Sequence, residues 1–510
     1  MGGARAGLAR QPFHIPAVLA CCLFAGCGLD HPMPLPPELT DAGVRSRLLI
    51  SEPHPAHIEP IMPVRAETEA DLDRSVFSLG DAVTYAQHHN PRLRSAKATL
   101  GGAKGQEEVA FAAFLPEVGI YGQSGTTSRN MGPGTPSLTG FLLTDGVGTH
   151  SYAQGLLQLQ WIVYDFGRRT ARHQQAIARQ RIAEFHLTRA DQTVQFDVAV
   201  AYLDILLARA SLLVQEDAIR QAESILKDAR ARFANGVADP DDVLRAEVQL
   251  SESRDGLVRA QEAKLVTIAQ LNNVMGRNAA LPLEVTELGL PPAEARLSLA
   301  KSLEIAGELR PEIQFARQGV VAAQEGVMAA KAAYRPNIYV RGATGGVDGN
   351  NVMTGWQNGV GLHLEIPLYT GGRLSGGVHE AEAEVSAAFA DAQVIVDRVS
   401  LEVTQAFQSE VAAGQRLELS RTAVVEAQEN LRLVRVKYRN GNATPTEIVD
   451  AETTLTRSQQ RLKSTLYTYL ATLARLDYTV GQPQGTILRH GRLPEMTPDS
   501  VPAVRSPRPR

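Results

Sequence analysis

The residues best suited to covalent or metal chemistry lie at one end of the chain. All three cysteines, Cys21, Cys22 and Cys27, fall within the first 27 of 510 residues. A cysteine can act as a nucleophile, pair in a disulfide or bind zinc as a thiolate, but here those uses are confined to this segment. The rest of the chain therefore offers no disulfide, no thiolate zinc site and no cysteine nucleophile.

Glycine-rich segments and histidines elsewhere do not form a catalytic motif. The segment 101–105 contains a lysine but lacks the spacing and the following serine or threonine of a phosphate-binding loop. The segment 122–125 lacks the residue that separates serine from glycine in a nucleophile elbow. His88 and His89 have no ligand-type residues nearby in the sequence. We therefore expect a protein that is not an enzyme and that holds no cofactor and no metal.

Cys27 follows a segment with the features of an export signal. Arg5 and Arg10 give that segment a positive start, and residues 15–26 form a short apolar stretch. The sequence Leu-Phe-Ala-Gly-Cys at 23–27 resembles a bacterial lipoprotein signal, in which Cys27 is acylated, as with palmitate, and becomes the first mature residue. An ordinary cleaved signal peptide is the alternative. With either signal the chain leaves the cytoplasm.

Composition favours long helices over a large aromatic core. Apolar residues make up 44% of the chain, but aromatic residues only 5%. The net charge of −4 gives no electrostatic argument for binding nucleic acid. After Cys27 there is no run of 18 apolar residues, so we expect no transmembrane helix. If the protein spans a membrane, it must do so with β-strands.

The chain repeats itself at a fixed distance. The sequence Tyr-Asp-Phe-Gly-Arg at 164–168 corresponds to Tyr-Thr-Gly-Gly-Arg at 369–373, which lies 205 positions later. Arg-Phe-Ala-Asn-Gly at 232–236 corresponds to Lys-Tyr-Arg-Asn-Gly at 437–441, again 205 positions later. Because one offset persists over more than a hundred positions, we infer a tandem duplication of a unit of about 200 residues, which is too long for a solenoid repeat.

Each unit contains a very long helix with a seven-residue repeat. No Gly or Pro interrupts residues 168–235, and 68 helical residues would extend roughly 100 Å. Apolar residues recur every seventh position at Val198, Ile205, Leu212, Ile219, Leu226 and Phe233, and in the second unit at Val403, Leu417, Val424, Leu431 and Tyr438. Mostly small residues follow three positions later, with Gln215 as the exception. Such rows predict coiled-coil packing with closely spaced helices.

Between the helices the pattern changes to alternation with a period of two. Four short segments show it, near residues 118–123, 157–161, 338–341 and 360–366. We expect four strands of about ten residues, with Pro367 near the end of the last strand. One apolar and one polar face is typical of barrel strands in a membrane, although a half-exposed soluble sheet shows the same alternation. Four strands cannot close a barrel, so a membrane location would require several copies.

Together, the duplicated units, the strand pairs, the long helices and the lipoprotein signal resemble the TolC or outer membrane efflux protein family over residues 77–482. The resemblance implies a mixed α and β membrane protein: a trimeric, twelve-stranded transmembrane β-barrel continuous with a long periplasmic coiled-coil tunnel. It implies a homotrimer in outer-membrane lipid, docked to a periplasmic adaptor (membrane fusion) protein and an inner-membrane pump of the RND type. The expected function is a passive exit duct of a tripartite efflux system.

Family positions that contact the adaptor or close the tunnel can be matched to this sequence. The resemblance implies adaptor-docking tips at Gly236 and Val237, and at Gly441 and Asn442. It also implies a closed-state hydrogen bond between two residues near these tips, which are Tyr438 and Asp242 in this chain.

The acids that narrow the family's tunnel correspond to Glu447 and Asp450. Being three positions apart, these two acids share one helix face. A trimer would then bring three copies of each toward the axis, a ring of negative charge that favours cations. The alternative interpretation is that acids in the first turn of a helix only complement its dipole.

The expected organisation has five segments: signal peptide 1–26, lipid-anchored Pro-rich tether 27–76, first repeat 77–290, second repeat 291–482 and disordered tail 483–510. Two functional alternatives remain. One keeps the fold but assigns the duct to type I protein secretion. The other, of a different class, is a periplasmic coiled-coil scaffold without a pore. The exported substrate is not encoded in any visible motif.

The lipoprotein assignment gives the first prediction. Cys27→Ser should abolish metabolic labelling with palmitate, because the substituted side chain has no thiol to acylate. We expect membrane insertion to persist in part, since the strands would still hold the protein in the bilayer. Labelling that persists undiminished in Cys27→Ser would show that Cys27 is not the acylated residue.

Overall fold

The computed structural model describes residues 75–127, 150–236, 239–288, 298–349, 355–440 and 442–482. From Val76 onward, these residues belong to one unit of the chain. The expected signal peptide, Cys27, the tether and the carboxyl-terminal tail lie outside the described residues, as do Val237 and Gly441.

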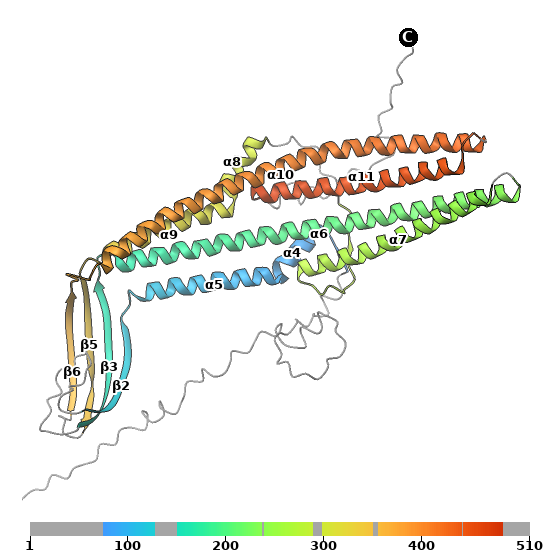
Figure 1. The fold of residues 1–510 in the computed structure, drawn as a ribbon. Helices are drawn as coiled ribbons and strands as arrows, with labels where there is room; N and C mark the ends of the chain where they lie inside the picture. The colour runs from blue at the N-terminus through green and yellow to red at the C-terminus, as the bar shows by residue number, and fades with distance from the viewer. Residues whose placement is uncertain are drawn as a thin grey trace, which may run out of the picture. The chain divides into compact units, whose positions relative to one another are not determined.

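Apart from the short strands β1 and β4 of the first half, the described chain contains two halves with the same order of elements (Figure 1). The first half contains β1 (Val76–Phe77), α4 (Leu79–His89), α5 (Pro91–Ala112), β2 (Glu117–Thr127), β3 (His150–Tyr164), α6 (Arg168–Ala234), α7 (Pro240–Met275) and β4 (Glu284–Val285). The second contains α8 (Leu299–Leu309), α9 (Pro311–Ala332), β5 (Asn337–Gly349), β6 (Gly355–Glu365), α10 (Arg373–Arg439) and α11 (Pro445–Val480). Corresponding helices have equal lengths: α6 and α10 have 67 residues, and α7 and α11 have 36.

The four expected strands are present and form one antiparallel sheet in the order β2, β3, β5, β6. Apolar residues line up across the strands: Leu159 pairs with Val118 on one side, and on the other side with Gly342, which in turn pairs with Val360 of β6. Val360, Leu362 and Leu364 of β6 are all more than half exposed on this apolar face. β6 ends at Glu365, two residues before Pro367, as predicted.

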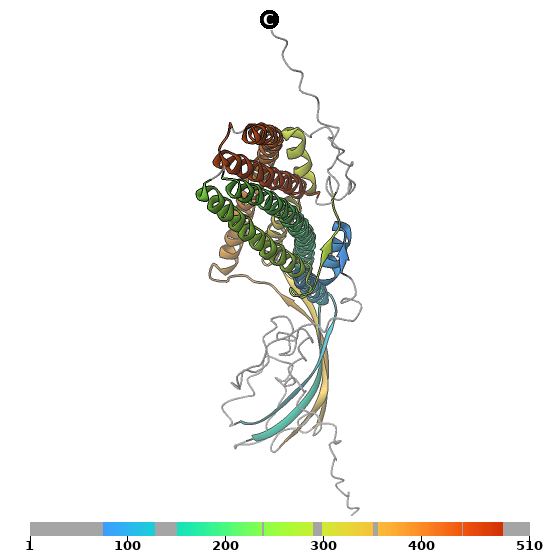
Figure 2. The ribbon, with the colours of Figure 1, turned by 90° about the vertical axis from the view of Figure 1, so that its right-hand side faces the viewer.

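Long helices account for most of the described chain. α6 packs against α7 and α11, and α10 packs against α11, which gives the lateral order α7, α6, α11, α10. Figure 2 shows α4 and α8 on the same side of these four helices. In the part of the chain that the structure describes, no helix combines the length and the apolar character needed to cross a membrane.

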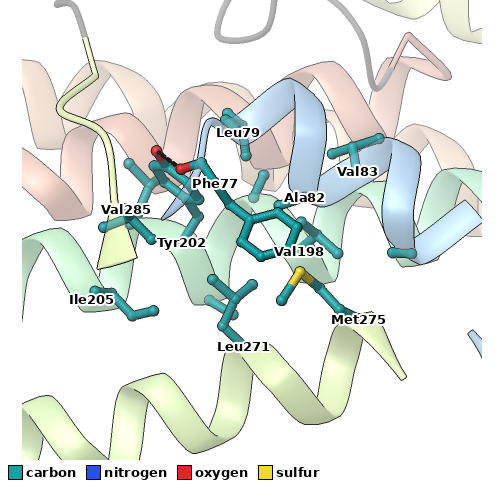
Figure 3. Packing of buried hydrophobic residues seen from close by; sticks show 14 of the residues in the cluster. Phe77, Leu79, Ala82, Val83, Val198, Tyr202, Ile205, Leu271, Met275 and Val285 are labelled. Atoms are coloured by element: carbon teal, nitrogen blue, oxygen red, sulfur yellow. Dashed lines mark hydrogen bonds between the residues drawn. The ribbon is translucent and has the colours of Figure 1, made fainter. Parts of the chain in front are cut away.

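The largest hydrophobic core lies where α4 and the two-stranded sheet of β1 and β4 cover α6 and α7 (Figure 3). Phe77, Val198 and Leu271 are almost completely buried there. Tyr202 is also fully buried; its hydroxyl donates to the carbonyl oxygen of Thr286 at 2.6 Å and lies 3.2 Å from the carbonyl oxygen of Phe77. A buried phenol needs such partners, so this residue ties the two short strands to α6.

The carboxyl-terminal end of α7 is held by two contacts with the junction of α4 and α5. Asn90, the residue between these helices, donates from Nδ2 to the carbonyl oxygen of Val274 at 2.6 Å. Gly276 ends α7 with φ +79°, and a Cβ there would lie 2.7 Å from the carbonyl oxygen of His89. Only glycine satisfies both the backbone angle and the close approach.

In the second half, charged groups make the corresponding contacts between the junction of α8 and α9 and the end of α11. Arg310 replaces Asn90 and donates from Nη1 to the carbonyl oxygen of Thr479 at 3.0 Å. Its guanidinium, with a side chain 2% exposed, also pairs with Glu402 and Glu312. Glu312 in turn pairs with Arg189 of α6 at 2.6 Å. Because a buried guanidinium is costly unless paired, these ion pairs tie α9, α10 and α11 to the first half.

The predicted seven-residue rows are buried along most of both long helices. Val198, Ile205 and Leu226 of α6 are buried, as are Val403, Leu417, Val424, Leu431 and Tyr438 of α10. The small residues three positions later are buried too, with relative exposures of 2–7% for the alanines that follow the α6 row. Other positions differ. Leu212 and Ile219 of α6 are only half-buried, Phe233 is 47% exposed near the end of α6, and Glu410, which interrupts the apolar row of α10, is itself buried.

The α7 anchor gives the second prediction. Gly276→Ala should lower the free energy of unfolding by about 2 kcal/mol, because it forces a side chain into a left-handed conformation against a backbone carbonyl. Gly377→Ala is the matched control, since Gly377 lies inside α10 with nothing within 4 Å of an added Cβ. That substitution should be neutral or stabilise by about 0.5–1 kcal/mol. Thermal unfolding followed by circular dichroism measures both. Equal effects of the two substitutions would contradict the claim that the end of α7 requires glycine at position 276.

Candidate functional site at the helical tips

The two hairpins of long helices have matching tips. α6 ends at Ala234 and is followed by Gly236 with φ +71°, and α7 begins at Pro240. In the second hairpin, the amide of Asn442 donates to the carbonyl oxygen of Lys437 at 2.8 Å, which closes the end of α10. Of the four expected docking residues, Gly236 and Asn442 are therefore placed at the turns. Val237 and Gly441 lie outside the described residues.

Glu447 and Asp450 lie in the first two turns of α11 and are both exposed. Thr444 caps this helix: its hydroxyl accepts from the backbone amide of Glu447 at 3.3 Å. Among the described residues, neither carboxylate has a cation within ion-pair distance. Both carboxylates are therefore exposed to solvent, as they would have to be to form a ring of charge around the axis of a trimeric tunnel. A role that only complements the helix dipole would look the same in one chain.

The corresponding positions of α7 carry a different pattern. Asp242 lies 205 positions before Glu447, and Arg245 lies 205 positions before Asp450. Arg245 pairs with Asp241 at 2.9 Å, while Asp242 has no ion-pair partner among the described residues. The two hairpins therefore differ at the position of Asp450, where α7 has an arginine instead of an acid.

The structure brings Tyr438 and Asp242 into the same region but describes no hydrogen bond between them. Arg232 lies between the hairpins, with its guanidinium carbon 3.8 Å from the centre of the Tyr438 ring. Its Nη2 also donates to the carbonyl oxygen of Tyr438 at 3.2 Å. Burial raises the pKa of Tyr438, Arg232 opposes that effect, and the charge of Asp242 adds to it. The contact between Arg232 and Tyr438 was not predicted from the sequence.

One further pair near the tips occurs twice. Arg435 of α10 contacts Glu452 of α11 at 2.6 Å, and the corresponding Arg230 contacts Glu247 at 2.7 Å. Both pairs join the two helices of a hairpin, and their members share the offset of 205 positions. The repetition of an Arg and a Glu at the same offset is the signal in the sequence that could have indicated these two ion pairs. The Glu452 side chain is only 6% exposed, whereas that of Glu247 is 43% exposed.

The described residues include no group of three or more His, Cys, Asp or Glu side chains that could hold a metal ion. The tips instead present exposed carboxylates, an aromatic ring stacked on an arginine, and two turns that contain glycine. Such groups can attract cations and contact another protein. They do not form a nucleophile with an adjacent base.

Comparison with known proteins identifies relatives over most of the chain. The model of the family described as "Outer membrane efflux protein" matches residues 83–277 and 303–482, one segment in each half. The outer membrane efflux protein BepC of Brucella suis is 26% identical over 392 residues, 75% of this chain and 80% of its own. The outer membrane protein TolC of Escherichia coli is 26% identical over 414 residues, 78% of this chain and 80% of its own.

A solved structure shares the fold. The crystal structure of the outer membrane protein VceC from Vibrio cholerae superposes with a TM-score of 0.68 at 23% identity. The superposition covers 79% of this chain and 96% of that one. At this identity the likeness concerns the arrangement of helices and strands. It does not extend to the residues at the tips.

Glu452 gives the third prediction. Burial raises its pKa, and Arg435 only partly offsets this effect. A carboxyl group with a raised pKa in the folded state contributes most stability below its unfolded pKa, about 4.3, and loses that contribution as pH rises through the folded value. Glu452→Gln should therefore become more stable relative to wild type as pH increases. The midpoint of thermal unfolding, measured across pH, tests this.

Glu247→Gln removes the corresponding exposed carboxylate and is the matched control for Glu452→Gln. Its difference from wild type should change much less with pH. If both variants show the same pH profile, burial of Glu452 has no special effect on the hairpin.

Proposed function

The chain belongs to the outer membrane efflux protein family, and we propose that three copies form a continuous exit duct across the outer membrane and the periplasm. The outer membrane is the location shared by its relatives TolC and BepC. The finer features are our inference: the trimer, the closed barrel, the duplicated origin of the halves, the acylated Cys27 and the partners.

The sheet is the observation that carries this proposal. Its order leaves β2 and β6 as edge strands, each hydrogen-bonded to a single neighbour among the described strands. One face carries exposed apolar side chains such as Leu362 and Leu364. Open edges are not tolerated in lipid, so β6 of one copy must pair with β2 of another for this face to meet a membrane. Three copies of four strands give the twelve strands expected from the family.

The helices continue the duct on the other side of the membrane. The lateral order α7, α6, α11, α10 forms a curved wall segment (Figure 2), and a helix of 67 residues extends about 100 Å. Their tips would contact a periplasmic adaptor, and an RND-type inner-membrane pump would deliver the substrate. Because a wide aqueous duct selects weakly, the pump rather than this chain chooses the cargo. Protein secretion by the same duct is the second candidate.

Reconstitution tests the duct directly. The full-length protein, purified and inserted into planar bilayers, should give discrete conductance steps, and unheated samples should migrate as trimers on gels. A monomeric rod that never conducts would favour the periplasmic scaffold instead. Export assays with a pump and with a secreted protein would then separate efflux from secretion.

The two acids expected to narrow the tunnel, Glu447 and Asp450, give the fourth prediction. Glu447→Gln combined with Asp450→Asn should move the cation-to-anion permeability ratio toward unity, because three copies of each carboxylate near the axis attract cations. Block by multivalent cations should weaken for the same reason. Reversal potentials under a salt gradient measure the ratio.

Asp241→Asn is the matched control, since it neutralises a first-turn acid of α7 that is paired with Arg245. It should leave selectivity close to wild type. Unchanged selectivity in the Glu447→Gln, Asp450→Asn variant would place the constriction elsewhere and leave these acids as surface residues of α11.

A further inference from the structure

The contacts that join the two halves of the chain have no counterpart within one chain. α6 of the first half packs against α9 and α11 of the second half. The counterpart of α6 is α10, and the counterparts of α9 and α11 are α5 and α7. Among the described elements, α10 makes no comparable contact with α5 or α7. One face of α10 therefore lacks the neighbours that the corresponding face of α6 has.

The exposure of apolar side chains follows this difference. Leu470 of α11 is 4% exposed in the core that it shares with α6, whereas the corresponding Leu265 of α7 is 68% exposed. Phe196 of α6 stacks on Tyr478 of α11 at 4.7 Å, whereas Leu401, the counterpart of Phe196 in α10, is exposed. α7 and α10 lie at opposite edges of the layer of long helices (Figure 1), so one chain cannot bring these faces together.

A hydrogen bond between α6 and α11 has charged counterparts at these edges. Gln460 of α11 donates from Nε2 to Ser211 Oγ of α6 at 2.6 Å. The residue 205 positions after Ser211 is Arg416 of α10, and the residue 205 positions before Gln460 is Asp255 of α7. Opposite charges thus occupy the two positions that form a hydrogen bond between the halves.

Both charged side chains can take a new partner. Arg416 is exposed and has no ion-pair partner among the described residues. Asp255 pairs with Arg259 one turn further along α7 at 2.8 Å, and both side chains are largely exposed. An exposed pair of this kind contributes little stability, so it does not prevent Asp255 from pairing with a second cation.

A second pair of counterparts lies at the tips. Arg232 of α6 stacks on the ring of Tyr438 of α10 at 3.8 Å. The residue 205 positions after Arg232 is Lys437, and the residue 205 positions before Tyr438 is Phe233. Lys437 and Phe233 are both exposed. A cation and an aromatic ring therefore recur at the corresponding positions, again without a contact in one chain.

α5 shows the same free face close to the sheet. Ala322 of α9 is buried against α6, where its carbonyl oxygen accepts from Gln175 Nε2 at 3.1 Å. α5 begins at Pro91 and α9 at Pro311, so Gly102 corresponds to Ala322. A Cβ at Gly102 would meet nothing within 4 Å, which leaves room for another helix against α5.

We propose that a second copy of the chain supplies the missing neighbours: its α5 and α7 pack against α10 in the register in which α9 and α11 pack against α6. Arg416 of one copy then pairs with Asp255 of the next copy, and Lys437 stacks on Phe233 of the next copy. The contact is head-to-tail, and it can close into a ring of three copies. This inference rests on the proposed function and assigns the residues and the register of its helical interface.

Chemical cross-linking of the full-length protein tests the register. Asp255→Cys combined with Arg416→Cys, treated with a short bis-maleimide, should give covalent dimers and trimers on fully denaturing gels. Asp255→Cys combined with Glu418→Cys is the matched control, because Glu418 is exposed but lies about half a turn around α10 from Arg416. This control and the two single-cysteine variants should stay monomeric on the same gels.

Charge reversal tests the same contact without added thiols. Arg416→Glu should lower the temperature at which trimers dissociate on gels, because two acids then face each other, and the shift should shrink at high salt. Adding Asp255→Lys should restore part of that temperature, since the pair is then reversed. Phe233→Ala should also lower it, and circular dichroism should show unchanged helix content in each variant.

Trimers that cross-link no better through the Asp255→Cys, Arg416→Cys pair than through the control pair would overturn the register and leave the duct in place. A further loss of trimer stability when Asp255→Lys is added to Arg416→Glu would also overturn it. A protein that light scattering shows to be monomeric in detergent would count against both the interface and the proposed duct.

Discussion

Close approach of helices along small-residue rows is the constraint on which the rest of this structure depends. A helix of 67 residues cannot bury a face against itself, and the chain has few aromatic residues to fill wide gaps. Buried alanines such as Ala222 in α6 and Ala427 in α10 let each long helix lie directly against its partner in the hairpin. The tips and the sheet are therefore held at opposite ends of continuous, laterally packed helices.

The two halves share this scaffold but differ in the side chains attached to it. Asn90 and Arg310 perform the same anchoring task, one with an amide and one with a buried guanidinium. Asp450 of α11 corresponds to Arg245 of α7, which pairs with Asp241, and Gly256 of α7 corresponds to Arg461 of α11. Because the backbone positions correspond, the functional features can be found in the differences between the halves.

Periodicity allowed the helices and the four strands to be predicted, because these features depend on neighbours within one segment, whereas the tips were matched to the pattern of the family. The stacking of Arg232 on Tyr438 and the pairing of Arg310 with Glu402 join distant segments, and no local pattern indicates them. Phe233 follows the seven-residue row yet is exposed, whereas the corresponding Tyr438 is buried under Arg232, a contact that the periodicity does not indicate. The roles of Glu447 and Asp450 stay predictions, because a ring of charge requires other copies of the chain.

The two ends of α11 are held by different contacts. Its carboxyl-terminal end is fixed by Gly481 against the backbone of Leu309 and by Arg310 on the carbonyl of Thr479. Near its start, Ala451 and Leu455 pack against Ala427 and Leu431 of α10, and Arg435 pairs with Glu452, while the carboxylates of Glu447 and Asp450 are exposed. Over 36 residues, about 54 Å, a small rotation at the fixed end produces its largest displacement at the start of the helix. The acids of α11 thus occupy the position on this helix where a change in packing moves charge the furthest.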